Sequence, residues 1–150
     1  MAHDEAIYTG TERRQARRII ANNRALCWAF GIGEGLLAAL LILGPALVYH
    51  GTFLHMDLAE MPLGFYLAYA GFVGLIHGGS SAVSAARFLE RERHPHLILT
   101  ESVLGWTAAF AVALFVAFLV GTAGDLSRVS LISAYVIGLP TLLLARSAGY

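Results

Sequence analysis

The chain has 150 residues, of which 57% are hydrophobic and 13% are charged, and its formal net charge is zero. A soluble domain of this size has about 45–50% apolar and about 25% charged residues, so this composition indicates lipid as the solvent. The zero net charge gives no reason to expect a nucleic-acid partner, and the single cysteine, Cys27, excludes an intrachain disulfide.

The first 24 residues are polar and lead into the first apolar block. We expect no cleavable signal peptide, because that block is longer than the apolar core of a signal. Within residues 11–24, Ile19 and Ile20 lie among five arginines, a pattern typical of an amphipathic helix on the inner leaflet. Alternatively, the arginines only set the topology. We assign residues 1–24 to a cytoplasmic or interfacial segment and residues 25–150 to a membrane domain.

Four apolar blocks follow, each close to the 20 residues that cross a hydrocarbon core of about 30 Å. The third block is expected to begin at Thr100 and Glu101, because a Thr cap and an acidic first turn favour a helix start. The sequence therefore predicts an all-α membrane protein with four transmembrane helices in an antiparallel bundle. The predicted spans are residues 25–49, 63–86, 100–121 and 129–146.

The arginines are distributed unevenly among the segments that connect these blocks. Nine of the ten lie before the first block, between the second and third, or at the end of the fourth. The other two connections contain only Arg128. Because positive residues are retained in the cytoplasm, this asymmetry predicts that both termini are cytoplasmic.

Glu34 and His77 are ionisable residues within apolar blocks, where a charge is unfavourable and often functional. Each lies nine residues from the cytoplasmic end of its predicted span, at a depth of about 14 Å. We therefore expect the two side chains to pair. One interpretation of this pair is a polar clamp between the first two helices. The other is a proton-coupled site or a docking place for a polar headgroup.

Glycines four residues apart flank both of these positions. Gly31 and Gly35 surround Glu34, and Gly74 and Gly78 surround His77. This spacing lets two helix backbones approach closely, so we expect the first and second helices to pack through these four glycines. The glycine run around Glu34 is not a nucleotide-binding loop, because no strand precedes it.

The six histidines raise the question of a haem or metal site. A haem with two axial histidines needs ligands that face each other from different helices, and only His77 lies deep within a block. At the outer edge, His50, His55, Asp57 and Glu60 are compatible either with a loose metal site or with a solvated loop. We assign no cofactor, no metal and no catalytic residue.

Short charged motifs border the last two blocks. Arg-Phe-Leu-Glu-Arg occupies residues 87–91, Gly-Asp-Leu-Ser-Arg occupies 124–128, and Leu-Ala-Arg closes the fourth block at 144–146. This arrangement resembles the membrane domain of bacterial sugar transferases, the polyprenyl-phosphate hexose-1-phosphate transferases. The likeness covers about residues 85–147, and its best matches are Ser127, Arg128 and Arg146.

The resemblance implies a nucleotide-fold-like module and a catalytic domain with an Asp-Glu pair after the membrane domain. The sequence ends four residues after Arg146 and holds neither part. We therefore carry over the architecture alone, and expect a truncated relative or one half of a split enzyme.

Three functions follow from these patterns. The first is a non-catalytic subunit of a bacterial inner membrane complex, which packs against membrane lipids and other membrane proteins or forms a homo-oligomer. The second is a membrane module of polyprenyl-linked sugar transfer for exopolysaccharide synthesis, with polyprenyl phosphate as a partner. The third is a small oligomeric transporter that uses Glu34.

Overall fold

The computed structural model describes residues 10–57, 59–90 and 95–148, and every regular element within these ranges is helical. This confirms the predicted all-α class. The long helices are α1 (Gly10–Val48), α2 (Leu63–Glu90), α3 (Pro95–Val120) and α4 (Arg128–Ala148). A π-helix, η1 (Tyr49–Phe53), directly continues α1, and a 3₁₀ turn, η2 (Ala123–Asp125), lies between α3 and α4.

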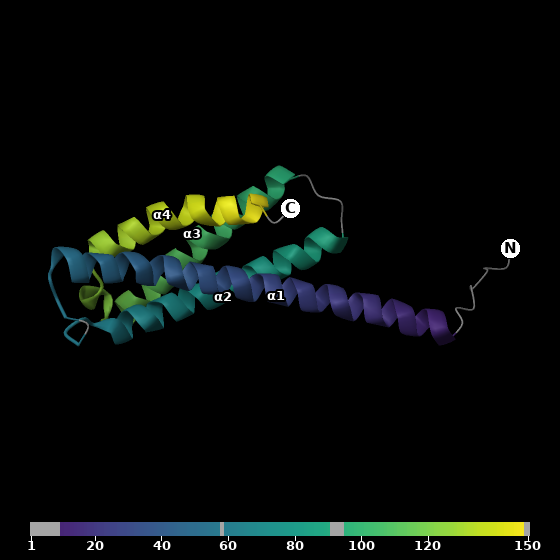
Figure 1. Cartoon of the computed structure of the whole chain (residues 1–150), viewed down its shortest axis with the longest axis horizontal. Helices are drawn as coiled ribbons and strands as arrows, with labels where there is room; N and C mark the ends of the chain where they lie inside the picture. Colours follow the sequence, from purple (N-terminus) through teal and green to yellow (C-terminus); the bar gives the residue numbers. More distant parts are fainter. Residues whose placement is uncertain (1–9, 58, 91–94, 149–150) are drawn as a thin grey trace.

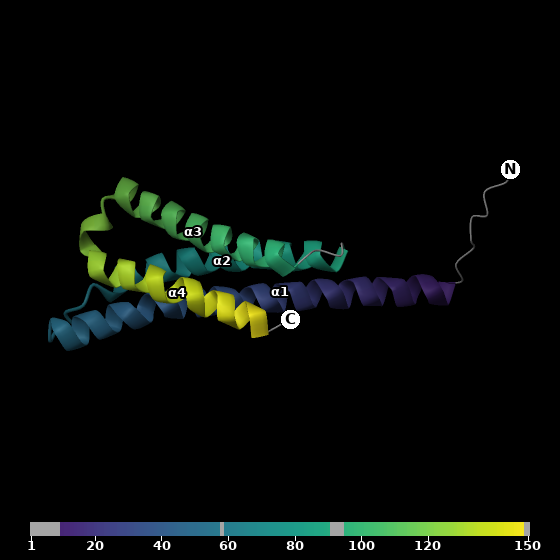
Figure 2. The same cartoon turned by 90° about the horizontal axis from the view of Figure 1, so that it is seen from above.

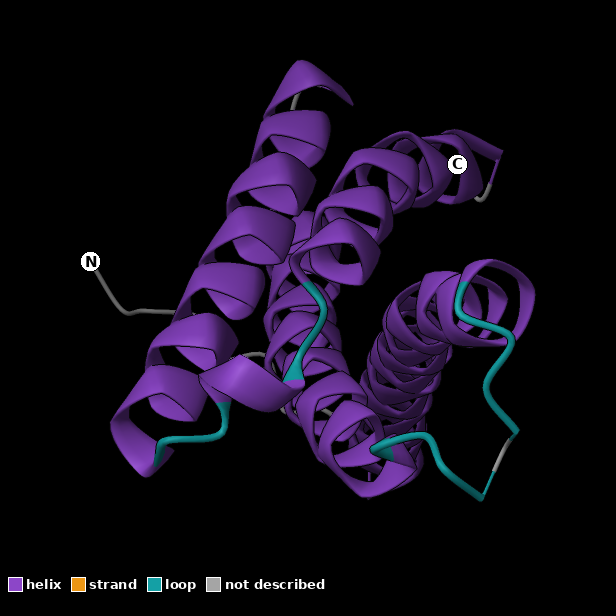
Figure 3. Ribbon diagram, turned by 90° about the vertical axis from the view of Figure 1, so that its left-hand side faces the viewer, coloured by secondary structure: helices purple, strands orange, loops and turns teal. Residues whose placement is uncertain are grey.

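The four long helices run alternately in opposite directions along one axis (Figures 1 and 2). α1 packs against α2 and α4, and α3 packs against the same two helices. Figure 3 looks along the helices from the end that carries the α1–α2 and α3–α4 connections. At the opposite end α1 extends well beyond the other three helices (Figure 1). Each helix is therefore in contact with two neighbours.

Three helical segments are long and apolar enough to cross a membrane: Asn23–Phe53, Leu99–Val120 and Arg128–Ser147. α2 is not among them, which differs from the four equivalent spans predicted. Its hydropathy is lowered by glycines, serines and His77, and several of these residues contact α1 or α3. Residues that face other helices need not be as apolar as residues that face lipid.

The interior is built from small and aromatic side chains. Trp106 of α3 is fully buried, and a Cβ added to Gly138 of α4 would lie 2.6 Å from its ring. The outer surface is also apolar: Phe115, Phe118 and Leu119 of α3 are between 61% and 72% exposed. Apolar surface of this extent is favourable when lipid tails cover it and unfavourable in water.

Several helix ends differ from the predicted ones. α3 begins at Pro95 and not at Thr100, because proline is well suited to a first helical position, where no N–H bond is required. α2 continues through Arg87 to Glu90, four residues beyond the predicted span. Arg and Glu are good helix formers, so a helix can continue after its apolar block has ended.

α1 begins at Gly10, fifteen residues before the predicted span. Residues 11–24 are helical and continue into the rest of α1 without a break. An interfacial helix that lies along the membrane would need a turn at this junction, and the structure has none there. Contact between this segment and the inner leaflet remains a prediction.

Candidate functional site: a buried ionic cluster

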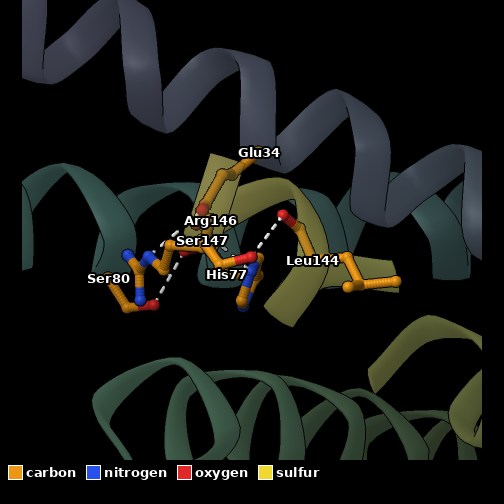
Figure 4. Close-up of polar contacts among 6 residues, drawn as sticks. All are labelled: Glu34, His77, Ser80, Leu144, Arg146 and Ser147. Atoms are coloured by element: carbon orange, nitrogen blue, oxygen red, sulfur yellow. Dashed lines mark hydrogen bonds and ion pairs between the residues drawn. The ribbon is translucent and has the colours of Figure 1, made fainter. Parts of the chain in front are cut away.

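The structure places the carboxylate of Glu34 between two cationic or potentially cationic side chains (Figure 4). Oε2 of Glu34 lies 3.5 Å from Nε2 of His77, so the two residues that the sequence singled out are adjacent. Oε1 lies 3.2 Å from Nε of Arg146. Neither contact has the alignment of a hydrogen bond. The Arg146 contact is an ion pair, whereas the His77 contact is one only when the imidazole is protonated.

The close approach of α1 and α2 positions Glu34 and His77. A Cβ added to Gly31 would lie 2.5 Å from the carbonyl oxygen of Gly78, and one added to Gly35 would lie 2.6 Å from that of Gly74. Any larger side chain at these positions would push the backbones apart. The four glycines predicted to pack thus form the crossing point of α1 and α2, with Glu34 at the same level.

Arg146 is the residue that sequence reasoning misplaced. It was expected to mark the cytoplasmic end of the fourth span, but α4 continues to Ala148 and the Arg146 side chain is only 1% exposed. Because an unpaired carboxylate is very unfavourable in an apolar interior, Glu34 requires a permanent cation, and arginine supplies one. Arg146 is the one arginine or lysine within the four predicted spans, and this was the signal that pointed to such a partner.

Aromatic rings enclose the cluster on two sides. The guanidinium carbon of Arg146 lies 5.7 Å from the ring centre of Phe30 on α1, a cation–π distance. The His77 ring meets the Trp106 ring edge-on, with centres 5.7 Å apart. Ser80 donates a hydrogen bond to the carbonyl oxygen of His77 at 2.7 Å, which is also drawn in Figure 4. All four long helices therefore contribute to the site.

The charged groups of the cluster contact one another, so the cluster links the helices and presents no free charged group. Glu34 is 5% exposed, His77 is fully buried, and both carboxylate oxygens already face a partner. A substrate that used Glu34 would have to displace Arg146 or His77. Three surface grooves lie elsewhere on the described part of the molecule, and no charged side chain lines any of them.

A second polar cluster, which the sequence did not suggest, joins the helices at the opposite end. His50 is 6% exposed, and its Nε2 lies 3.1 Å from the hydroxyl of Tyr66. The backbone N–H of Ser127 donates to the same hydroxyl at 2.7 Å. Since Tyr66 accepts that bond, its own proton is available to His50. The cluster links η1, the start of α2 and the residue that precedes α4.

The position of His50 can be compared with the loose metal site that the sequence suggested, which comprised His50, His55, Asp57 and Glu60. His50 is turned inward to Tyr66, whereas His55 is exposed and has a positive φ of 51°. Among residues 10–57, 59–90 and 95–148, no group of three His, Cys, Asp or Glu side chains is arranged to hold a metal ion.

The residues that carry the resemblance to sugar transferases occupy structural positions. Oγ of Ser127 accepts the backbone N–H of Ser130 at 3.4 Å, which is the geometry of a helix N-cap. Arg128, the first residue of α4, is exposed, and Arg146 is held by Glu34. Comparison with protein-family models, curated proteins and solved structures finds no match for this chain.

Proposed function

We propose that this chain is a non-catalytic module of the bacterial inner membrane, which crosses the bilayer four times as an antiparallel bundle with both ends in the cytoplasm. Its role is to pack against lipids and other membrane proteins within a larger complex. The observation that carries this proposal is the internal pairing of Glu34 with Arg146 and His77. The pairing leaves no charged group of this cluster available to a substrate.

The distribution of polarity supports the membrane assignment. The ionic cluster is buried between helices, whereas exposed apolar side chains cover the outside of all four long helices. In a bilayer, polar groups are favourable when they pair between helices, and lipid tails solvate the apolar exterior. The same arrangement would be unfavourable for a soluble protein. The uneven distribution of arginines supports the orientation.

Fusion of a periplasm-active reporter and a cytoplasm-active reporter tests the topology. Insertions at Asp57 and Gly124, in the two connections at the outer end, should activate only the periplasmic reporter. Fusions at either terminus should activate only the cytoplasmic reporter. The reverse pattern, or periplasmic activity of one terminus alone, would refute the four-crossing topology.

Purification from native membranes in mild detergent, with mass spectrometry of the co-purifying molecules, tests the role. We expect a larger membrane protein at fixed stoichiometry. A monodisperse homodimer without another protein would contradict the subunit role. Uptake of a substrate that Glu34→Gln abolishes while the folded fraction stays unchanged would instead identify a transporter.

The second candidate is a membrane module of polyprenyl-linked sugar transfer, which rests on the resemblance over residues 85–147. Two of its best-matching residues have structural roles in this chain, since Ser127 caps the start of α4 and Arg146 pairs with Glu34 near its end. This candidate predicts that a polyprenyl phosphate, or a chain with a soluble catalytic domain, co-purifies with the protein. Co-purification of neither would count against it.

A further inference from the structure

His50 is a buried histidine that has no part in the ionic cluster around Glu34. It lies in η1, about four helical turns from Glu34 along the chain. Its ring meets the rings of Tyr49 and Tyr66 edge-on, with centres 5.4 Å apart in both cases. Short π-helical segments such as η1 are rare and frequently occur at functional sites. Histidine is also the side chain that ordinarily changes its charge between about pH 5 and 8.

The hydrogen bonds of His50 depend on its protonation state. The Tyr66 hydroxyl accepts the backbone N–H of Ser127 at 2.7 Å and lies 3.1 Å from Nε2 of His50. Its own proton is paired when Nε2 accepts it, which requires that Nε2 carries no proton. With a neutral His50, a continuous chain of hydrogen bonds therefore joins the residue before α4 to α2 and η1.

Protonation of His50 removes the acceptor at the end of this chain. Both ring nitrogens then carry a proton, so the Tyr66 hydroxyl has no nitrogen to which it can donate. Nδ1 of His50 is also buried, and it has no hydrogen-bond partner among the described residues. Unpaired donors and a buried charge are both unfavourable, so the closed arrangement suits the neutral ring.

The surroundings of His50 supply no counter-ion for a protonated ring. The groups that face it are the phenols of Tyr49 and Tyr66, which are uncharged at neutral and acidic pH. Over the ranges that the structure describes, no carboxylate forms an ion pair with His50. Residues 107–120 of α3 contain no ionisable side chain. The ionisable side chains of the adjacent segments are exposed: His55, Asp57, Glu60, Asp125 and Arg128.

We propose that His50, Tyr66 and Ser127 form a pH-sensitive switch, which holds η1, α2 and the start of α4 together while His50 is neutral and releases them when His50 is protonated. Release is a local movement, because η1 is the last part of the candidate span Asn23–Phe53 and the exposed loop residues follow it directly. The switch depends on the folded bundle and goes beyond the proposed function. In the proposed topology this end of the bundle faces the periplasm, so the switch responds to periplasmic acidity.

Backbone hydrogen exchange in the full chain, reconstituted in nanodiscs, tests the switch at about pH 7.5 and about pH 5. Each rate is expressed as a protection factor, relative to an unstructured peptide at the same pH, because the chemical exchange rate itself changes with pH. The released state binds one more proton than the closed state, so the closed state loses stability as the pH falls. We expect the protection factor of Ser127 to fall by at least about tenfold in acid, as coupling to one proton predicts. That of Gly138, which packs against Trp106 in the middle of α4, should fall much less.

Variants identify the group that takes up the proton. His50→Gln keeps a side-chain amide that can bond to Tyr66 but does not titrate, so Ser127 should stay protected at both pH values. His55→Gln, which removes the exposed histidine of the same connection, is the matched control and should keep the full acid effect. If His50→Gln does not fold, Tyr66→Phe decides the result. It lacks the hydroxyl that joins the cluster, so the protection factor of Ser127 should be low at both pH values.

Three outcomes would overturn the inference. The first is a protection factor of Ser127 that is the same at both pH values. The second is an acid effect that persists in full in His50→Gln or Tyr66→Phe, or that disappears in His55→Gln. The third is an equal fall at Gly138, which would mean that acid opens the whole bundle. None of these outcomes bears on the membrane role, which fails separately if the chain is not retained in carbonate-washed membranes.

Discussion

Arg146, near the end of α4, lies with its Nε atom 3.2 Å from Oε1 of Glu34 on α1. The two residues are 112 positions apart in the sequence, and both side chains are at least 95% buried. The pair joins the first and last helices of the chain. His77, on the other side of the carboxylate, brings α2 into the same cluster.

Removing one member of the Glu34–Arg146 pair should strongly destabilise the protein. Glu34→Gln or Arg146→Gln leaves a buried charge without its partner, and we expect each to lower the free energy of unfolding by about 3–5 kcal/mol. Unfolding in detergent micelles, followed by circular dichroism, measures this change.

The double variant provides the control for that prediction. Glu34→Gln combined with Arg146→Gln removes both charges and should be more stable than either single variant. If the losses of unfolding free energy of the two single variants simply add in the double variant, the two residues do not interact and the buried ion pair is refuted.

His77 should contribute less than Arg146. It faces the carboxylate at 3.5 Å without hydrogen-bond alignment, and polar contacts between membrane helices contribute about 0.6 kcal/mol on average and about 1.7 kcal/mol at most. We expect His77→Gln to lower the unfolding free energy by about that range, as measured in the same assay. A loss as large as that of Arg146→Gln would mean that His77 stabilises the cluster as strongly as the Arg146 ion pair does, and would contradict this ranking.

The glycines at the α1–α2 crossing should not tolerate even a methyl group. In Gly35→Ala or Gly74→Ala the new Cβ would lie 2.6 Å from a backbone oxygen, so we expect a loss of roughly 1–3 kcal/mol from overpacking. Gly33→Ala, with open space around its Cβ, should be neutral or slightly stabilising, because alanine is the better helix former. Equal thermal unfolding of all three variants would argue against the close crossing.

Tyr66→Phe should loosen the end of the bundle that carries the α1–α2 and α3–α4 connections. The hydroxyl contacts both His50 and the backbone N–H of Ser127, and removing it leaves buried groups without a partner. We expect a loss of about 1–3 kcal/mol, together with faster amide hydrogen exchange at the start of α4. Tyr49→Phe keeps the ring contacts with His50 and Phe53 and serves as the control. Unchanged exchange at Ser127 in Tyr66→Phe would contradict this role.

Local sequence patterns were sufficient for the helical class and for the contact between the first two helices. The apolar blocks predict helices because an isolated backbone in lipid must satisfy its own hydrogen bonds. The glycine spacing around Glu34 and His77 predicts a close crossing because only glycine allows two backbones to touch. Helix ends were less predictable. α2 continues into a charged segment whose residues also favour a helix. α3 begins before its predicted start because Pro95 suits a first helical position.

What the sequence determined by itself was therefore the helical fold class and the crossing of α1 and α2, since each follows from a pattern that is local to a single helix. Only the tertiary structure decided the partner of Glu34. Arg146 reads locally as an ordinary positive charge at the end of a span, and nothing in its neighbourhood distinguishes it from Arg128. It becomes the counter-ion because packing of α4 against α1 brings it to a carboxylate that has no other permanent charge beside it.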